Sequence, residues 1–203
     1  IVVADGMGGH VAGEIASELA TERVAEIPPG EEAITPRDRV NSANERLLLA
    51  VRENPALLGM GTTMTLGVFD DGGMLHIGHV GDSRAYLLRD GEMRQLTRDH
   101  TVVAELVALG HLSPEAAEHH PQRHLLTRTL GLGPVEVDEY EYRLQPGDRV
   151  LICSDGLTSM VDDDDIRAMA GGDVEATVWA LIEAANAAGG VDNTTVAIVD
   201  VSE

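Results

Sequence analysis

The sequence predicts an α+β fold, and two patterns carry that prediction. Between residues 62 and 96 apolar and polar residues alternate with a period of two, and turn signals separate the runs, as in an antiparallel meander. Apolar residues with helical spacing occur in pairs of segments before and after this block, at 11–27, 36–54, 162–169 and 173–188. Antiparallel strands with helices arriving in pairs indicate a single α+β domain over residues 1–203.

The chain opens with the apolar run Ile1–Ala4, which we expect to form a buried strand that stops at Asp5. A buried strand at residue 1 has no preceding element, so we expect this domain to be N-terminally incomplete. The helix at 11–27 follows, with Ile15, Ala16, Leu19, Ala20 and Val24 on its apolar face.

Local signals mark where this first helix ends and the next begins. Pro28-Pro29-Gly30 ends the first helix. Thr35-Pro36 is typical of an N-cap followed by proline at the first helical position, and it opens the helix to about Asn54, with Val40, Leu47 and Val51 on one side.

The meander follows as four strands, at 63–69, 74–80, 83–88 and 92–96. Asp70–Gly73 predicts a turn, and Asp90-Gly91 is a strong hairpin signal. A helix from His100 to Leu109 should stop at Gly110, and Ser113-Pro114 should open a short one.

The second half holds three further strands. Within 135–144 the apolar set changes from odd to even positions, which predicts a bulge. A core strand at 149–154 breaks at Asp155-Gly156, and the strand at 194–201 comes last.

Composition excludes several classes of function. Fourteen Lys+Arg against 35 Asp+Glu give a formal charge of −21, which argues against binding nucleic acid or anionic lipid. Hydrophobic content of 43% supports a sizeable core, and no run approaches the length of a membrane span. A single Cys excludes a disulfide framework and points to a reducing compartment.

Four aspartates lie where apolar strands begin or end. Asp5, Asp82 and Asp155 each follow such a run with Gly beside them, and Asp192 precedes the last strand. Taken alone, each Asp-Gly is more simply turn chemistry, as at Asp90-Gly91. If the strand ends meet at one edge, however, four carboxylates would repel unless cations lay among them, and oxygen ligands suit Mg²⁺ or Mn²⁺.

Six short motifs follow one another along the chain. They are Val3–His10, Gly61-Thr62-Thr63, Gly81-Asp82-Ser83-Arg84, Leu96–His100, Ser154–Leu157 and Asp192–Thr195. This is the order found in bacterial type-2C (PPM) phosphatases, and the chain resembles this metal-dependent Ser/Thr protein phosphatase family over essentially its whole length.

The resemblance implies a fold and a site. The fold would be a four-layer αββα sandwich, two antiparallel sheets flanked by helix pairs. Asp5 would bridge two Mn²⁺ or Mg²⁺ ions, and the Gly6 carbonyl would help to hold one of them. Asp155 and Asp192 would complete the coordination of the second ion, and Asp82 would help to bind a third. Asp5, Asp155 and Asp192 are the expected catalytic residues. A metal-activated water would attack phosphorus directly, and no phosphoenzyme intermediate would form.

The resemblance also marks a flap and two departures. Residues 101–128 match the family's variable flap, and a solvated flap is favoured over a zinc site at His119 and His124. The family's phosphate-gripping Arg would lie on a strand before Asp5, so we expect that strand to be missing. Some family members carry a histidine, proposed as the general acid, at the position of Met7. His10 lies nearby, but we assign it no general-acid role.

Other nucleophiles are less favoured. No Arg follows Cys153 at the spacing of cysteine phosphatases, so Cys153 is interpreted as a buried strand residue. No nucleophile elbow surrounds Ser154. The run Asp162–Asp165 is interpreted as a helix cap and not a calcium loop.

The leading hypothesis is hydrolysis of phosphoserine and phosphothreonine in proteins. The expected partners are phosphorylated proteins and a Ser/Thr protein kinase, with no nucleic acid and no membrane contact within this segment. We expect a cytoplasmic monomer, or the cytoplasmic part of a longer protein. Two alternatives stay open: a catalytically weak domain that binds phosphoproteins, and a phosphatase of anti-sigma-factor antagonists.

Overall fold

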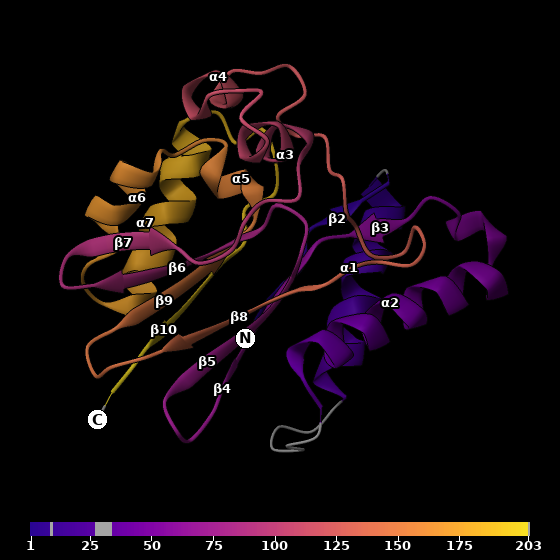
Figure 1. Cartoon of the computed structure of the whole chain (residues 1–203), viewed down its shortest axis with the longest axis horizontal. Coiled ribbons are helices and arrows are strands. Elements are labelled where there is room, and N and C mark those ends of the chain that lie inside the picture. Colours follow the sequence, from indigo (N-terminus) through magenta and orange to yellow (C-terminus); the bar gives the residue numbers. More distant parts are fainter. Residues whose placement is uncertain (9, 27–33, 203) are drawn as a thin grey trace.

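Two four-stranded antiparallel sheets form the centre of the molecule. The computed structural model describes residues 1–8, 10–26 and 34–202 (Figure 1). The first sheet has the order β1-β4-β5-β8, with β1 at Val2–Val3, β4 at Met64–Phe69, β5 at Met74–Val80 and β8 at Asp138–Arg143. The second has the order β10-β9-β6-β7, with β10 at Val196–Asp200, β9 at Arg149–Cys153, β6 at Arg84–Arg89 and β7 at Glu92–Gln95.

Helices cover the outer face of each sheet. Helices α1 (His10–Ala25) and α2 (Pro36–Glu53) lie on one side, and α6 (Asp163–Met169) and α7 (Val174–Ala187) on the other (Figure 1). No helix among the described residues is both long and apolar enough to cross a bilayer.

Three apolar clusters hold the four layers together. The first packs Ala16, Ala20 and Leu47 of α1 and α2 against Met64 and Leu66 of β4. The second lies between the sheets, with Leu75 and Ile77 facing Leu87, Val150 and Ile152. The third packs Ile166 and Leu181 on Tyr86, Leu151 and Cys153. The predicted αββα sandwich is confirmed.

Shorter elements gather at one end of the sandwich. Helices α3 and α4 lie close together beyond the sheets, and α5 begins at the end of β9 (Figure 1). The two-stranded sheet β2-β3 and the 3₁₀ helix η1 lie on the side of α1 and α2. Their bounds are α3 Val102–Ala108, α4 Pro114–Glu118, α5 Asp155–Thr158, β2 Gly6–Met7, β3 Gly61–Thr62 and η1 Pro55–Leu57.

Local signals placed most element ends correctly. Thr35 caps α2: its side chain accepts from the Asp38 N–H, and the Asp38 carboxylate accepts from the Thr35 N–H. At the β6–β7 hairpin, Asp90 and Gly91 have φ of 54° and 82°, which Asp-Gly tolerates. Asp162 is the N-cap residue of α6, as predicted, although its side chain makes no capping hydrogen bond. The predicted stop at Pro28-Pro29-Gly30 lies outside the described residues.

The predicted bulge near residue 137 is wrong. Strand β8 begins only at Asp138, and it pairs with β5 in regular register from Asp138 to Arg143. Val137 precedes the strand and packs with the α1–α2 cluster, whereas Tyr140 and Tyr142 face the cluster between the sheets. The apolar set changes parity because the chain changes layers there.

Candidate functional site

Asp5 lies where β1 ends, and two threonines hold its backbone. The Asp5 N–H donates to Thr63 Oγ1 at 2.9 Å, and the Asp5 carbonyl accepts from Thr62 Oγ1 at 2.9 Å and from the Thr63 N–H at 2.8 Å. Thr62 and Thr63 are buried, so water does not compete for these bonds. Both sides of the Asp5 peptide are therefore fixed to the segment that enters β4.

Gly6 continues into β2, which pairs with β3 through Gly6 and Thr62. A Cβ at Gly6 would overlap the carbonyl oxygen of Gly13 in α1. Only glycine permits this approach of α1 to the Asp5 loop.

Asp155 and Asp192 are brought together by the ends of β9 and β10. Ser154 ties the two ends, because its N–H donates to the Thr195 carbonyl at 3.0 Å and its Oγ accepts from the Thr195 N–H at 3.0 Å. A Cβ at Gly156 would overlap the Asn193 carbonyl, so this contact too requires glycine. Ser154 is thus engaged with the backbone of the neighbouring strand.

Asp82 follows β5 and is almost fully buried. Beside it, the Gly81 N–H donates to His100 Nδ1 at 3.1 Å. The Ser83 hydroxyl hydrogen-bonds Thr63 Oγ1 at 2.8 Å, and Thr63 is the residue that holds Asp5. A buried polar network therefore links the Asp5 loop to the Asp82 loop.

The four aspartates and Gly6 line one cavity of about 880 Å³. Burial raises the pKa of Asp5 to about 8, reinforced by the charge of Asp155, a hydrogen bond with it, and the charges of Asp192 and Asp82. Burial and the charges of Asp155 and Asp99 raise the pKa of Asp82 to about 7. The tertiary structure thus brings together every carboxylate that the sequence singled out.

This donor set suits a hard divalent cation. Among the described residues, no three His, Cys, Asp or Glu side chains lie close enough to hold a metal ion in the arrangement seen. The carboxylates instead surround a shared space at a cost that the raised pKa values of Asp5 and Asp82 record. A cation among them would remove that cost, and all-oxygen ligands are those of Mg²⁺ and Mn²⁺.

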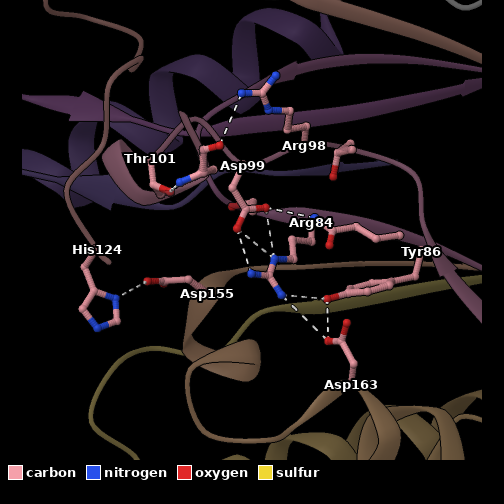
Figure 2. Close-up of polar contacts among 12 residues, drawn as sticks. Arg84, Tyr86, Arg98, Asp99, Thr101, His124, Asp155 and Asp163 are labelled. Carbon is pink, nitrogen blue, oxygen red and sulfur yellow. Dashed lines mark hydrogen bonds and ion pairs between the residues drawn. The ribbon is translucent and has the colours of Figure 1, made fainter. Parts of the chain in front are cut away.

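Two features of the cavity were not predicted. His124 Nδ1 lies 3.8 Å from Asp155 Oδ2, so this flap residue points toward Asp155 (Figure 2). Arg123 and Arg128 also line the cavity, and Arg128 donates to Asp138 at 2.7 Å. The sequence marked residues 101–128 as a flap, with His124 only as a less favoured zinc ligand together with His119, and nothing in the residue spacing pointed to these contacts.

A second polar cluster, centred on Arg84, lies beside the site. Arg84 Nε and Nη2 donate to Asp99 at 3.0 and 2.8 Å, and Arg84 Nη1 donates to the Tyr86 hydroxyl at 3.2 Å (Figure 2). Tyr86 in turn donates to Asp163 at 2.9 Å. The cluster ties β6 to the loop before α3 and to α6.

The structure also bears on Cys153, which the sequence analysis considered as a nucleophile. Cys153 is fully buried, as predicted, and burial raises the pKa of its thiol to about 12, which suppresses thiolate formation. The side chain of His10 lies outside the described residues.

Comparison with known proteins gives a consistent picture. The family model described as Protein phosphatase 2C matches residues 1–189. The serine/threonine protein phosphatase PstP of Mycobacterium tuberculosis is 43% identical over 206 residues, which cover 99% of this chain and 40% of PstP. The serine/threonine phosphatase stp of Listeria welshimeri is 39% identical, over 98% of this chain and 83% of its own length.

Solved structures agree. The PstP catalytic domain in complex with two manganese ions matches with a TM-score of 0.90 and 40% identity, covering 100% of this chain and 87% of that one. The chain spans about two fifths of the full length of the M. tuberculosis relative.

Proposed function

The chain belongs to the protein phosphatase 2C family, and on this premise we propose that it hydrolyses phosphoserine and phosphothreonine in proteins with two Mn²⁺ or Mg²⁺ ions. The observation that carries the proposal is the convergence of Asp5, Asp82, Asp155 and Asp192 on one cavity, with the pKa values of Asp5 and Asp82 raised. The match to PstP with two manganese ions supports the choice of metal.

Each site residue has a proposed role. Asp5, Asp155 and Asp192 hold two ions, the Gly6 carbonyl assists, and Asp82 helps to hold a third. When bound, such ions activate water for in-line attack on phosphorus and offset the charge of the phosphate. Thr62, Thr63 and Ser154 keep the carboxylate-bearing loops in place.

The test is metal-dependent hydrolysis of para-nitrophenyl phosphate and of a phosphothreonine peptide. We expect activity with Mn²⁺, and we expect Asp155→Asn or Asp192→Asn to lower kcat/KM at least about 100-fold, more than loss of an outer-shell partner. A matched control is Asp71→Asn, in the exposed β4–β5 turn, which should retain activity.

Two results would contradict the proposal. One is the absence of hydrolysis at saturating Mn²⁺. The other is a fall in kcat/KM in Asp71→Asn as large as that in the Asp155 or Asp192 variants. Calorimetric Mn²⁺ binding without hydrolysis would favour the alternative, a domain that binds phosphoproteins without turnover.

We further propose that the substrates include those of a Ser/Thr protein kinase and that the chain acts as a monomer in the cytoplasm. The single, buried Cys suits a reducing compartment. Anti-sigma-factor antagonists stay open as a substrate class.

A further inference from the structure

The cavity that holds the four carboxylates has an apolar rim. Eight large apolar side chains are exposed among the described residues, and four of them, Met7, Leu125, Leu132 and Val191, line this cavity. Their exposed fractions run from 36% at Met7 to 79% at Val191. Half of this exposed apolar set therefore gathers at one opening, although single exposed side chains are normally scattered.

The rim contains two apolar pairs, one beside Gly61 and one beside Gly189. A Cβ at Gly61 would lie 3.3 Å from Met7 Cγ and 3.6 Å from Leu132 Cγ, so both side chains lie over this glycine. A Cβ at Gly189 would lie 3.7 Å from Val191 and 3.9 Å from Met160 Sδ, which makes these two neighbours. Met7 follows Asp5 closely, and Val191 directly precedes Asp192.

The rim and the carboxylates share one space, and this decides what can occupy it. A cavity of about 880 Å³ is large for a single phosphorylated side chain, because pockets of roughly 300–1,000 Å³ bury drug-sized ligands. An occupant that presents phosphate to the carboxylate end must therefore place its neighbouring residues against the rim.

Apolar surface, and not charge, bears on the chemistry of those neighbouring residues. Charges of both signs line the cavity, because Arg123 and Arg128 lie there with Glu136, and Arg128 pairs with Glu136 and Asp138. Local charge therefore favours neither acidic nor basic neighbours, whereas apolar neighbours would cover Leu125 and Leu132 from water.

We propose that the rim, defined as Met7, Leu125, Leu132, Met160 and Val191, binds apolar side chains that flank the phosphorylated residue of a protein substrate. The inference rests on the proposed phosphatase function, and it adds a preference of that same site for apolar over polar sequence context.

The experiment compares two seven-residue phosphothreonine peptides with Mn²⁺ as cofactor. One carries leucine at the two positions on each side of phosphothreonine, and the other carries serine at these four positions. We expect kcat/KM to favour the leucine peptide by roughly 5- to 20-fold, the range for partial burial of one or two leucines.

Variants then locate the preference. The double variant Leu125→Ser, Leu132→Ser should bring the ratio of the two kcat/KM values close to one. The matched control Leu58→Ser, Leu109→Ser removes two exposed leucines outside the cavity and should keep the ratio. Thermal unfolding of both double variants checks that they are folded. Calorimetry with non-hydrolysable phosphonate analogues of the two peptides repeats the comparison without turnover.

The outcomes separate this inference from the phosphatase function. Equal hydrolysis of the two peptides, or an equal loss of preference in the Leu58, Leu109 control, would overturn the proposal that the rim binds apolar side chains. A rim that joins two copies of the chain would show as a dimer that dissociates in the Leu125, Leu132 variant while the ratio stays unchanged, which would also overturn it. If neither peptide nor para-nitrophenyl phosphate is hydrolysed, the phosphatase function fails, and the calorimetric preference for the leucine analogue then supports or refutes the rim.

Discussion

Burial acts with opposite sign on the acids and on the histidine behind the site. It raises the pKa of Asp5 and Asp82, because the charged carboxylate is disfavoured, and it lowers the pKa of His79 to about 4, because the charged imidazolium is disfavoured. His79 Nε2 lies 3.0 Å from the Arg98 carbonyl, which can only accept, so this nitrogen carries the proton. His79 Nδ1 faces Thr65 Oγ1 at 2.9 Å.

This histidine gives a prediction for stability against pH. Because the pKa of His79 in the folded protein lies below that of a free histidine, its neutral form stabilises the fold fully above about pH 6.5. That stability should fall by about 1.4 kcal/mol per pH unit towards pH 4. Urea unfolding of the metal-free protein and of His79→Asn should show a difference in unfolding free energy that shrinks as pH falls.

The control for this prediction is His111→Asn, which changes an exposed histidine in the loop between α3 and α4. It should leave the pH dependence of unfolding in place. A difference between wild type and His79→Asn that stays constant from pH 7.5 to pH 4.5 would count against a neutral, buried His79.

Among the elements, strand ends and their glycines determine where the carboxylates lie. Asp5 follows β1, Asp82 follows β5 and Asp155 follows β9. Hydrogen bonds between loops then hold the strand ends together, as between Ser154 and Thr195. Gly156 matters because its missing side chain leaves room for the Asn193 carbonyl, and so for the loop that carries Asp192.

Gly156→Ala should therefore weaken metal binding. The added Cβ overlaps the Asn193 carbonyl and must push the Asp192 loop away from Asp155. Overpacking of this kind costs about 1–3 kcal/mol, so we expect Mn²⁺ affinity to fall about tenfold or more in calorimetric titration.

Gly171→Ala is the matched control, because nothing lies within 4 Å of a Cβ at Gly171. Its Mn²⁺ affinity should equal that of the wild type. Unchanged affinity in Gly156→Ala would show that the Asp192 loop does not depend on this contact.

At the scale of the whole molecule, the charge of −21 sets the background in which the site works. Two divalent ions would offset only a small part of this charge, so metal binding accounts for the position of a few carboxylates and not for the overall acidity. The gain from the ions is local, at Asp5 and Asp82, where burial and mutual repulsion oppose the charged forms.

Mn²⁺ should therefore stabilise the whole fold. A ligand that binds only the folded state adds about 2.7 kcal/mol at one hundred times its Kd, which raises the Tm. Thermal unfolding at pH 7.5 with Mn²⁺, and with EDTA in NaCl of the same ionic strength, measures this. Asp155→Asn should lose most of the rise. A rise that NaCl alone reproduces would mean that general screening, and not a bound ion, stabilises the protein.

Several features follow from residues that are neighbours in the chain. The cap at Thr35, the hairpin at Asp90-Gly91 and the ends of the apolar strands follow from local backbone preferences, and these place Asp5, Asp82 and Asp155 at strand ends. The family motifs added the expectation of a metal site and of two sheets between helix pairs.

Which of these residues meet depends on contacts between distant segments. The four aspartates are far apart in sequence, and they converge because sheet pairing and close glycine contacts bring the loops together. The same holds for the approach of His124 to Asp155, for the change of layer at Val137 that the sequence pattern suggested was a bulge, and for the apolar rim. Local sequence sets the conformation of each segment, whereas packing between distant segments sets which side chains share a cavity.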